Sequence, residues 1–260
     1  MKPAVHGHRG ARAVFPENTL PAFEYAIHTG VDAIELDVLA TKDDVLVVTH
    51  DPLINADICR GGPAGIAVRD LTFDELVCYD CGSQVNPRFP LQRAVPGARI
   101  PSLDEVLDLW RLGDFTFNIE VKSFPAPEFT PSPDAYARLL LARLAAHRVT
   151  HRVLVQSFDF RVLASIRRID PLIRLAALWE GPERDILDFA REAGTRAVSL
   201  FHELIRPDNV LCAHEAGIDV LAWTPNDEPA WYRLAAADVD AIITDDPAPL
   251  IEFLRSRDAA

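Results

Sequence analysis

Two kinds of segment alternate along most of this 260-residue chain. Short runs rich in apolar and β-branched residues are separated by longer segments with helical spacing, which is typical of a parallel sheet whose strands are joined by helices. The predicted strands are residues 4–8, 33–39, 45–49, 116–121, 152–156, 173–178, 197–200, 218–223 and 241–244. Because a chain of about 250 residues with about eight β/α units has the usual size of a TIM (β/α)8 barrel, we predict this α/β fold as a single domain over residues 4–254.

The helices expected between these strands have recognisable starts. Asn18 is the predicted N-cap of the first helix, and Ser102 with Glu105 forms a predicted capping box at the second. The predicted helices are residues 19–29, 103–112, 133–147, 160–169, 183–193, 207–216, 228–237 and 247–255.

One interval breaks the alternation. Residues 51–101 carry the turn-forming sequences Gly61-Gly62-Pro63, Asn86-Pro87 and Pro96-Gly97, and a structureless loop of that length is uncommon in a compact domain. We therefore expect a small inserted subdomain after the second strand, with a short helix that begins at Thr72. We expect this insertion to cap the barrel mouth.

Composition excludes several classes of function. With 39 acidic and 26 basic residues the net charge is −13, so a general nucleic-acid binder, which needs a basic face, is not expected. No stretch approaches the roughly 18 apolar residues of a membrane span, and the first residues are too polar for a secretory signal. Four cysteines are too few for a disulfide framework in a chain of this length. We expect a cytoplasmic protein with reduced thiols, as a monomer or small homo-oligomer.

Polar residues gather at the carboxyl ends of the predicted strands, which form one face of a parallel barrel. Glu35 and Asp37 are two residues apart on one strand, so both side chains point to the same side. Glu120 and Lys122 repeat this spacing on another strand. Three carboxylates in one buried place predict a hard divalent cation, Ca²⁺ or Mg²⁺. The alternative is a purely structural ion-pair cluster in which Lys122 and Arg9 neutralise the acids.

Two histidines lie beside this acidic group. His8 and His50 each occupy the end of a strand next to a predicted metal-binding strand, where two imidazoles can act as general acid and general base. Arg9 offers a planar fork for phosphate oxygens, and Lys122 offers a point charge. A metal ion, two cations and two histidines together describe a site for phosphodiester cleavage.

The motifs that carry these residues resemble those of the glycerophosphodiester phosphodiesterase family. They are Gly7-His8-Arg9-Gly10, Pro16-Glu17-Asn18-Thr19, Glu35-Leu36-Asp37-Val38, Thr49-His50-Asp51, Pro101-Ser102-Leu103-Asp104-Glu105-Val106-Leu107, Asn118-Ile119-Glu120-Val121-Lys122, Gln156-Ser157-Phe158, Trp223-Thr224 and Ile243-Thr244-Asp245-Asp246-Pro247. The resemblance covers nearly the whole chain. It implies a TIM barrel with an insertion after the second strand and metal-dependent hydrolysis of deacylated phospholipids to glycerol 3-phosphate and an alcohol.

The resemblance also implies roles for individual residues. His8 and His50 would be the acid–base pair, Arg9 and Lys122 would bind phosphate, and one divalent cation would bind the three acids. Phe158 and Trp223 would line the glycerol side of the pocket, with core packing as the alternative for Trp223. The order Trp223-Thr224-Pro225-Asn226 departs from the family's usual Trp-Thr-Val-Asn, which bears on substrate preference. The rival hypotheses are a phospholipase-D-like enzyme acting on intact lipids and a barrel that binds phosphodiesters without turnover.

Overall fold

A closed parallel barrel forms the centre of the computed structural model, which describes residues 2–258. Within these residues, eight parallel strands pair in the order β1-β9-β8-β7-β6-β5-β4-β2, and pairing between β1 and β2 closes the barrel. The strands are β1 (Ala4–Gly7), β2 (Ala33–Ala40), β4 (Thr116–Val121), β5 (Val153–Ser157), β6 (Arg174–Trp179), β7 (Ala197–Phe201), β8 (Asp219–Trp223) and β9 (Ala241–Thr244). The predicted TIM barrel is therefore confirmed.

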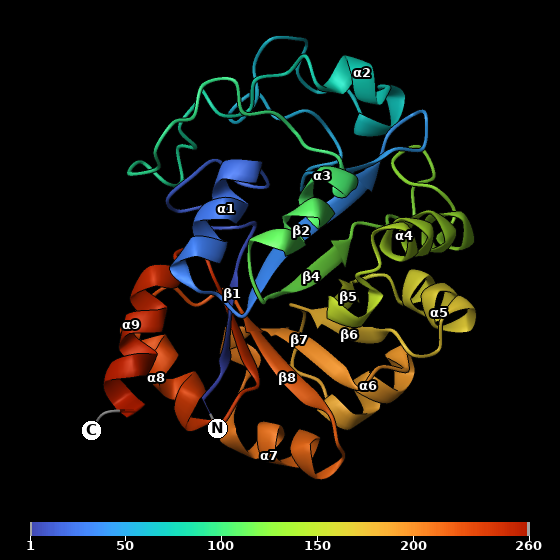
Figure 1. Cartoon of the computed structure of the whole chain (residues 1–260). Helices are drawn as coiled ribbons and strands as arrows, with labels where there is room; N and C mark the ends of the chain where they lie inside the picture. The colour runs from blue at the N-terminus through green and yellow to red at the C-terminus, as the bar shows by residue number, and fades with distance from the viewer. Residues whose placement is uncertain (1, 259–260) are drawn as a thin grey trace.

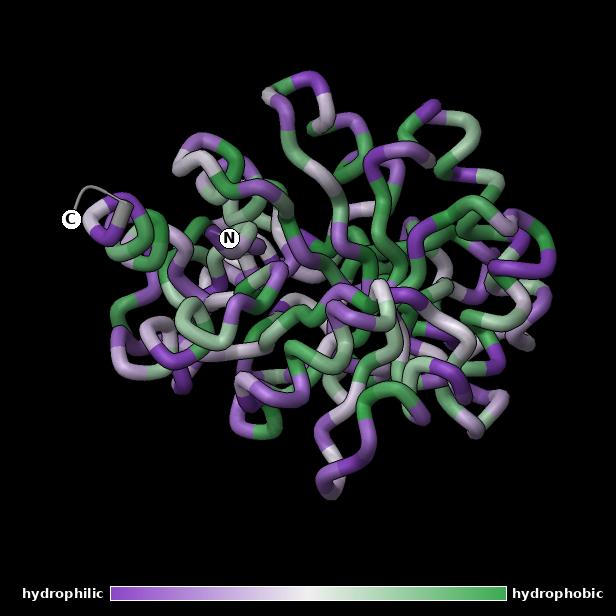
Figure 2. The backbone as a smooth tube through the Cα atoms, turned by 90° about the horizontal axis from the view of Figure 1, so that it is seen from below, coloured by the Kyte–Doolittle hydropathy of each residue, from purple (hydrophilic) through white to green (hydrophobic). Residues whose placement is uncertain are grey.

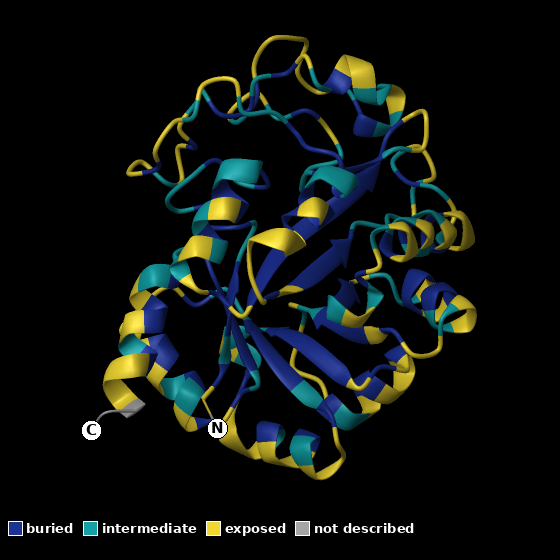
Figure 3. Cartoon of the chain, in the orientation of Figure 1, coloured by how far each residue is buried: buried dark blue, intermediate teal, exposed yellow. Residues whose placement is uncertain are grey.

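Helices surround the barrel and bury one face each against it (Figure 1). The α-helices are α1 (Leu20–Thr29), α3 (Leu103–Leu107), α4 (Pro133–His147), α5 (Phe160–Ile169), α6 (Ile186–Ala193), α7 (Pro207–Glu215), α8 (Glu228–Ala236) and α9 (Pro247–Asp258). Figure 3 shows buried strands inside and exposed outer faces on the helices. Figure 2 shows many of the hydrophobic (green) segments toward the middle of the molecule. This core between strands and helices stabilises the barrel through apolar burial.

Several predicted helix boundaries were wrong by a turn or less. The predicted helix 103–112 is α3 followed by the 3₁₀ turn η2 (Asp108–Leu112), and α6 begins three residues later than predicted, after its N-cap Asp185. The capping box of Ser102 and Glu105 is present. Two further 3₁₀ turns are η3 (Thr150–Arg152) and η4 (His202–Leu204).

The segment between β2 and α3 departs from the β/α repeat. The short strand β3 (Leu46–Val48) runs antiparallel to β2, and the chain then forms η1 (Val68–Asp70) and α2 (Phe73–Leu76) before it reaches α3. Figure 1 shows this segment beside the carboxyl end of β2. It has its own small apolar core, formed by Leu39, Val47, Ile54, Val68, Leu76, Tyr79 and Ile100 together with Cys59 and Cys81.

A disulfide joins Cys59 to Cys81 inside this small core. The expectation of reduced thiols was therefore wrong for these two residues, whereas Cys78 and Cys212 are exposed free thiols. Cys78 and Cys81 are only three residues apart in the sequence, but the path of the loop brings Cys59 to Cys81 instead. A segment with few regular elements has a small core, so a covalent link adds stability that packing alone supplies poorly.

Replacing both bonded cysteines by serine is expected to destabilise the protein. A disulfide closing a loop of this length, with 22 residues of sequence separation, contributes about 3 kcal/mol in the chain-entropy model. Thermal unfolding of the Cys59→Ser, Cys81→Ser variant should therefore start at a lower temperature than that of the oxidised parent protein. The matched control is Cys78→Ser with Cys212→Ser, which removes exposed thiols and should leave the unfolding curve unchanged. Equal stability of the two double variants would contradict the prediction.

Among residues 2–258, no helix combines the length and the apolar character that a membrane crossing requires.

Candidate active site

Three buried carboxylates meet where β2 pairs with β4. Asp37 is the register partner of Glu120 on the neighbouring strand, and Glu35 lies two residues before Asp37. Ligand oxygens of Glu35, Asp37 and Glu120 all lie within 4.8 Å of one another. Parallel strand pairing thus brings together side chains that are more than 80 residues apart in the sequence.

Burial and mutual repulsion disturb the ionisation of this cluster. Burial, followed by repulsion from Asp37 and Glu120, raises the pKa of Glu35 well above its usual value. Burial likewise raises the pKa of Glu120, although Lys122 opposes the shift. Burial would also raise the pKa of Asp37, but the charges of Lys122 and Arg9 outweigh it and hold that pKa well below its usual value. The cluster therefore carries more negative charge than its neighbours balance easily.

Arg9 and Lys122 contact the same carboxylates. Lys122 Nζ lies 2.7 Å from Glu120 Oε1 and 3.2 Å from Asp37 Oδ1. Arg9 Nε lies 3.2 Å from Asp37 Oδ2, and its Nη1 donates to Glu17 at 2.6 Å. The ion pairs expected if Lys122 and Arg9 neutralise the acids are thus present. They involve the same three carboxylates that could hold a metal ion.

His8 is held by a carboxylate from the last strand of the barrel. Its Nδ1 lies 2.6 Å from Asp245 Oδ1, directly after β9, while its Nε2 lies 3.9 Å from Glu35 Oε2. Burial alone would raise the pKa of Asp245. The hydrogen bond and charge of His8, together with the charge of Arg12, outweigh burial and hold that pKa well below its usual value. An ionised carboxylate only accepts hydrogen bonds, so Nδ1 carries the proton and Nε2 faces the cluster. Arg12 Nε and Asn226 Nδ2 also donate to Asp245, at 2.6 and 2.8 Å.

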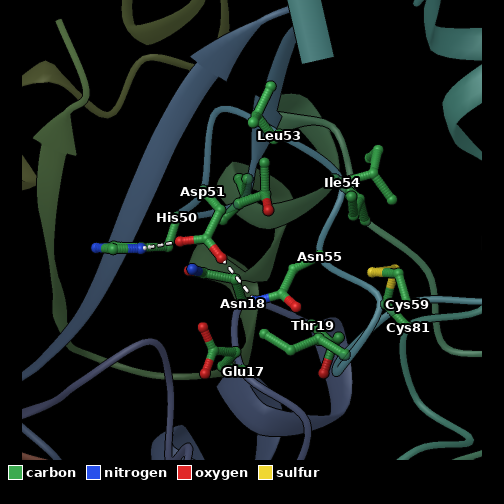
Figure 4. A pocket seen from close by; sticks show the side chains of 14 residues that line it. Glu17, Asn18, Thr19, His50, Asp51, Leu53, Ile54, Asn55, Cys59 and Cys81 are labelled. Carbon is green, nitrogen blue, oxygen red and sulfur yellow. Dashed lines mark hydrogen bonds and ion pairs between the residues drawn. A yellow bond between two sulfur atoms is a disulfide. The ribbon is translucent and has the colours of Figure 1, made fainter. Parts of the chain in front are cut away.

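His50 has an equivalent partner in the insertion. Its Nδ1 lies 2.7 Å from Asp51 Oδ1, and Asn55 Nδ2 donates to the other oxygen of Asp51 at 2.9 Å. The hydrogen bond from His50 is the main reason that the pKa of Asp51 falls to about 2. Figure 4 shows the three side chains in a row, with the Cys59–Cys81 disulfide in the wall of the same small pocket. Each histidine therefore has a carboxylate on Nδ1, which leaves Nε2 for chemistry.

The loop between β1 and α1 needs glycine to approach its neighbours. Gly10 has a φ of 84°, and a Cβ there would lie 2.6 Å from the carbonyl carbon of Ala22. A Cβ on Gly7 would lie 2.1 Å from the carbonyl oxygen of Gly10. Because neither glycine has a Cβ, the loop packs tightly, and the Arg9 backbone N–H donates to Glu35 Oε2 at 3.0 Å.

Asn18 has a different task from the one predicted. The N-cap of α1 is Thr19, whereas Asn18 has a φ of 55° and its Nδ2 donates to Asp37 Oδ2 at 2.8 Å. The N-cap prediction was wrong because Asn18 lies one residue too early, and its buried side chain meets a carboxylate from the barrel instead.

The insertion also holds the β1–α1 loop from outside. Gln92 Nε2 donates to the carbonyl oxygen of Arg12 at 2.7 Å, and Asn86 Nδ2 donates to Glu17 Oε2 at 3.2 Å. The Arg12 guanidinium lies 5.1 Å from the ring centre of Phe89. The insertion therefore contacts Glu17, which pairs with Arg9, and Arg12, which pairs with the Asp245 partner of His8.

The predicted site residues surround one cavity of about 340 Å³ at the barrel mouth, which we call the central cavity. Phe158 is 41 % exposed, and Trp223 is half-buried with its ring edge-on to Phe158 at 5.9 Å. Trp223 Nε1 donates to the carbonyl oxygen of Ser199. The predicted site residues that line this cavity are His8, Arg9, Glu35, His50, Glu120, Lys122, Phe158 and Trp223. Asp37 joins them through the carboxylate cluster.

Several residues with clear contacts in the site were not assigned from the sequence. Glu17, Asn18, Asp51 and Asp245 all occur within the quoted motifs, but nothing in a linear pattern says which side chain each one meets. Gln156 Nε2, which donates to Glu35 Oε1 at 3.3 Å, belongs to the same group.

Comparison with known proteins places this geometry in a family. The family model described as "Glycerophosphoryl diester phosphodiesterase family" matches residues 8–249. A protein of Caldanaerobacter subterraneus subsp. tengcongensis named glycerophosphodiester phosphodiesterase is 32% identical over 98% of this chain and 99% of its own.

Solved structures agree with this result. The crystal structure of a putative glycerophosphoryl diester phosphodiesterase from Silicibacter pomeroyi superposes with a TM-score of 0.92, at 31% identity over 98% of this chain and 94% of that one. An Oleispira antarctica phosphodiesterase, solved in complex with the product sn-glycerol-3-phosphate, has the same fold, with a TM-score of 0.83 at 22% identity over 97% of each chain. The chain therefore belongs to the glycerophosphoryl diester phosphodiesterase family, and it is a phosphoric diester hydrolase.

Proposed function

We propose that this enzyme hydrolyses glycerophosphodiesters to glycerol 3-phosphate and an alcohol, with a divalent cation and the histidines His8 and His50. The observation that carries the proposal is the central cavity, where both histidines, two cations and a carboxylate cluster face a space large enough for a small phosphodiester. Glycerol 3-phosphate bound to the Oleispira antarctica relative supports the nature of the product.

The carboxylates fit a hard divalent cation. Three oxygen donors within 4.8 Å of one another suit Ca²⁺ or Mg²⁺, which prefer carboxylate oxygens and keep positions open for a substrate. We propose Glu35, Asp37 and Glu120 as the ligands. When bound, the cation supplies charge that stabilises negative phosphate oxygens.

The protein's own residues would supply the remaining chemistry. Arg9 and Lys122 bring positive charge to the phosphate, although both also contact the carboxylates at rest. His8 and His50 each have Nε2 available, so one imidazole can take a proton from the oxygen that attacks phosphorus and the other can give a proton to the departing alcohol oxygen. Overall a bond forms between water oxygen and phosphorus, and the bond from phosphorus to the alcohol oxygen breaks. Phe158 and Trp223 offer apolar surface to the glycerol carbons.

The insertion is proposed to cap the barrel mouth. Arg88 lines the central cavity, and Pro52 lies beside His50 in the neighbouring one. Through these residues segment 51–101 would contact the substrate and select its alcohol head group. Its hydrogen bonds to the β1–α1 loop would keep the two parts in register during turnover.

Release of glycerol 3-phosphate from a set of glycerophosphodiesters tests this function. The purified enzyme with added Ca²⁺ or Mg²⁺ is expected to release glycerol 3-phosphate in step with the free alcohol, as measured by a coupled dehydrogenase assay. An intact diacyl phospholipid presented in micelles is the matched control and distinguishes the phospholipase-D-like alternative. Release of phosphatidic acid from the intact lipid, with no turnover of the deacylated esters, would overturn the proposal.

A further inference from the structure

One segment of the insertion has a charge opposite to that of the whole chain. Residues 84–99, which we call the arginine segment, contain three arginines and no acidic residue, although the net charge of the chain is −13. Arg99 pairs with Glu105 at 2.5 Å. Arg88 and Arg93 are exposed, and among the residues that the structure describes no carboxylate forms an ion pair with either. The segment therefore presents positive charge to solvent that no neighbouring acid balances.

Apolar side chains stand in solvent beside these two arginines. Leu91 is 90 % exposed, and Val85, Pro87 and Pro90 are exposed as well. A single exposed leucine is ordinary on a protein surface, but here apolar and cationic residues follow one another without an acid between them. This combination is typical of segments that attach to an anionic lipid surface, where apolar side chains enter the head-group region and cations pair with phosphates.

Hydrogen bonds at the base of the arginine segment hold it in place. Gln92 Nε2 donates to the carbonyl oxygen of Phe15 at 3.0 Å, and Gln92 Oε1 accepts from the Asn86 backbone N–H at 3.1 Å. The Arg93 backbone N–H donates to the carbonyl oxygen of Val14 at 2.8 Å. The backbone is thus fixed on the β1–α1 loop before any partner arrives, so that docking costs little conformational entropy.

The arginine segment lies beside the barrel mouth. Arg88 lines the central cavity, and Asn86 contacts Glu17 of the β1–α1 loop. Much of the outer edge of the insertion is exposed, as the yellow stretches in Figure 3 show. A surface that binds the arginine segment would therefore meet the end of the molecule at which the central cavity opens.

We propose that the arginine segment docks the enzyme on an anionic phospholipid surface. Leu91 enters the head-group region, and Arg88 and Arg93 lie among the lipid phosphates. One protruding leucine among prolines lacks the aromatic and apolar core of a protein interface, whereas single side chains between cations suffice for weak attachment to a charged bilayer. The proposed substrate is a deacylated phospholipid, which hydrolysis of acyl esters releases at such a surface, so docking brings the central cavity to the place of supply.

Sedimentation with large unilamellar vesicles tests the proposal. The purified protein is mixed with vesicles of phosphatidylglycerol and phosphatidylcholine in equal amounts, and with vesicles of phosphatidylcholine alone. Its partition coefficient should be about tenfold or more higher on the mixed vesicles, because each arginine near the surface is attracted by anionic lipid. Raising NaCl from about 0.1 M to about 0.5 M should remove most of this difference, because salt screens the attraction.

Two matched pairs of variants locate the contact. Leu91→Asp should lower the partition coefficient on mixed vesicles by about fivefold or more. Leu172→Asp should leave it within about twofold, because Leu172 is 92 % exposed but precedes β6, at the opposite end of the barrel. Arg93→Glu should weaken binding by about fivefold or more, whereas Arg257→Glu near the end of α9 should not. Arg93 and Arg257 are both exposed and each lies over an aromatic ring, so the second pair is also matched.

The possible failures are distinguishable. The unfolding temperature of each variant should match that of the parent protein, and the arginine pair decides the question if Leu91→Asp folds poorly. Equal binding to the two kinds of vesicle, or equal effects within each pair of variants, would overturn the proposal. Self-association that Leu91→Asp abolishes, without vesicle binding, would also overturn it and assign the segment to a contact between copies of the chain. Because sedimentation requires neither metal nor turnover, these results are independent of the proposed phosphodiesterase function.

Discussion

Removal of divalent metal with a chelator is expected to abolish release of glycerol 3-phosphate, and addition of Ca²⁺ or Mg²⁺ should restore it. The physical reason is the charge of the cluster. Glu35, Asp37 and Glu120 are buried within 4.8 Å of one another, and burial with repulsion drives the pKa of Glu35 upward. Without a cation, Lys122 and Arg9 stay paired with the carboxylates, so that little of their charge is left to stabilise a phosphate.

The chelator experiment has a structural readout beside activity. Adding Ca²⁺ or Mg²⁺ to the metal-free protein should raise its unfolding temperature, because a ligand that binds only the folded state stabilises it. Glu35→Gln keeps the shape of the side chain and removes its charge, so this shift should shrink. The control is Glu183→Gln on the outer surface, where the carboxylate pairs with Arg206. Full activity in metal-free buffer would remove the three carboxylates from the metal assignment.

Alanine at either His8 or His50, the proposed acid–base pair, is expected to lower kcat by ~10²-fold or more, the usual scale for a lost acid–base group. His8 and His50 each hold a carboxylate on Nδ1, which leaves Nε2 for the proposed proton transfer. Steady-state turnover of a glycerophosphodiester at saturating concentration measures the effect. Because the side chains are lost from a cavity rather than from the apolar core, the variants should still fold.

The matched control for these variants is His214→Ala. His214 Nε2 lies 2.9 Å from Asp240 Oδ2, so it reproduces a histidine–carboxylate pair outside the central cavity. Its kcat should stay within about twofold of the parent value, since it contacts no predicted site residue. Near-parental turnover in the His8 or the His50 variant would exclude that residue from proton transfer.

Regular patterns of short range were readable from the sequence. The period of two on a strand placed Glu35 and Asp37 on one side, and strand pairing then set Asp37 beside Glu120. The barrel followed from the alternation of strand and helix, because each helix must bury its apolar face against the sheet. Capping at Ser102 was also predictable, since its partner Glu105 is only three residues away.

Contacts that depend on closure of the barrel were not readable. His8 meets Asp245 only because β1 pairs with β9, which brings residues from the two ends of the chain together. Asn18 was interpreted as a helix cap because a linear pattern weighs only its neighbours, whereas its partner is Asp37 on β2. The pairing of Cys59 with Cys81 depends on the path of an irregular segment, for which no period exists.

The sequence by itself determined the barrel, the chemical types in the site and the end of the strands where they gather, because local periodicity and strand direction fix these. Only the tertiary structure decided which groups touch. It gave each histidine its carboxylate, and it set the cations among the acids. The physical reason is that hydrogen bonds and ion pairs require atoms to lie within a few ångströms, a distance that chain folding, and not sequence spacing, creates.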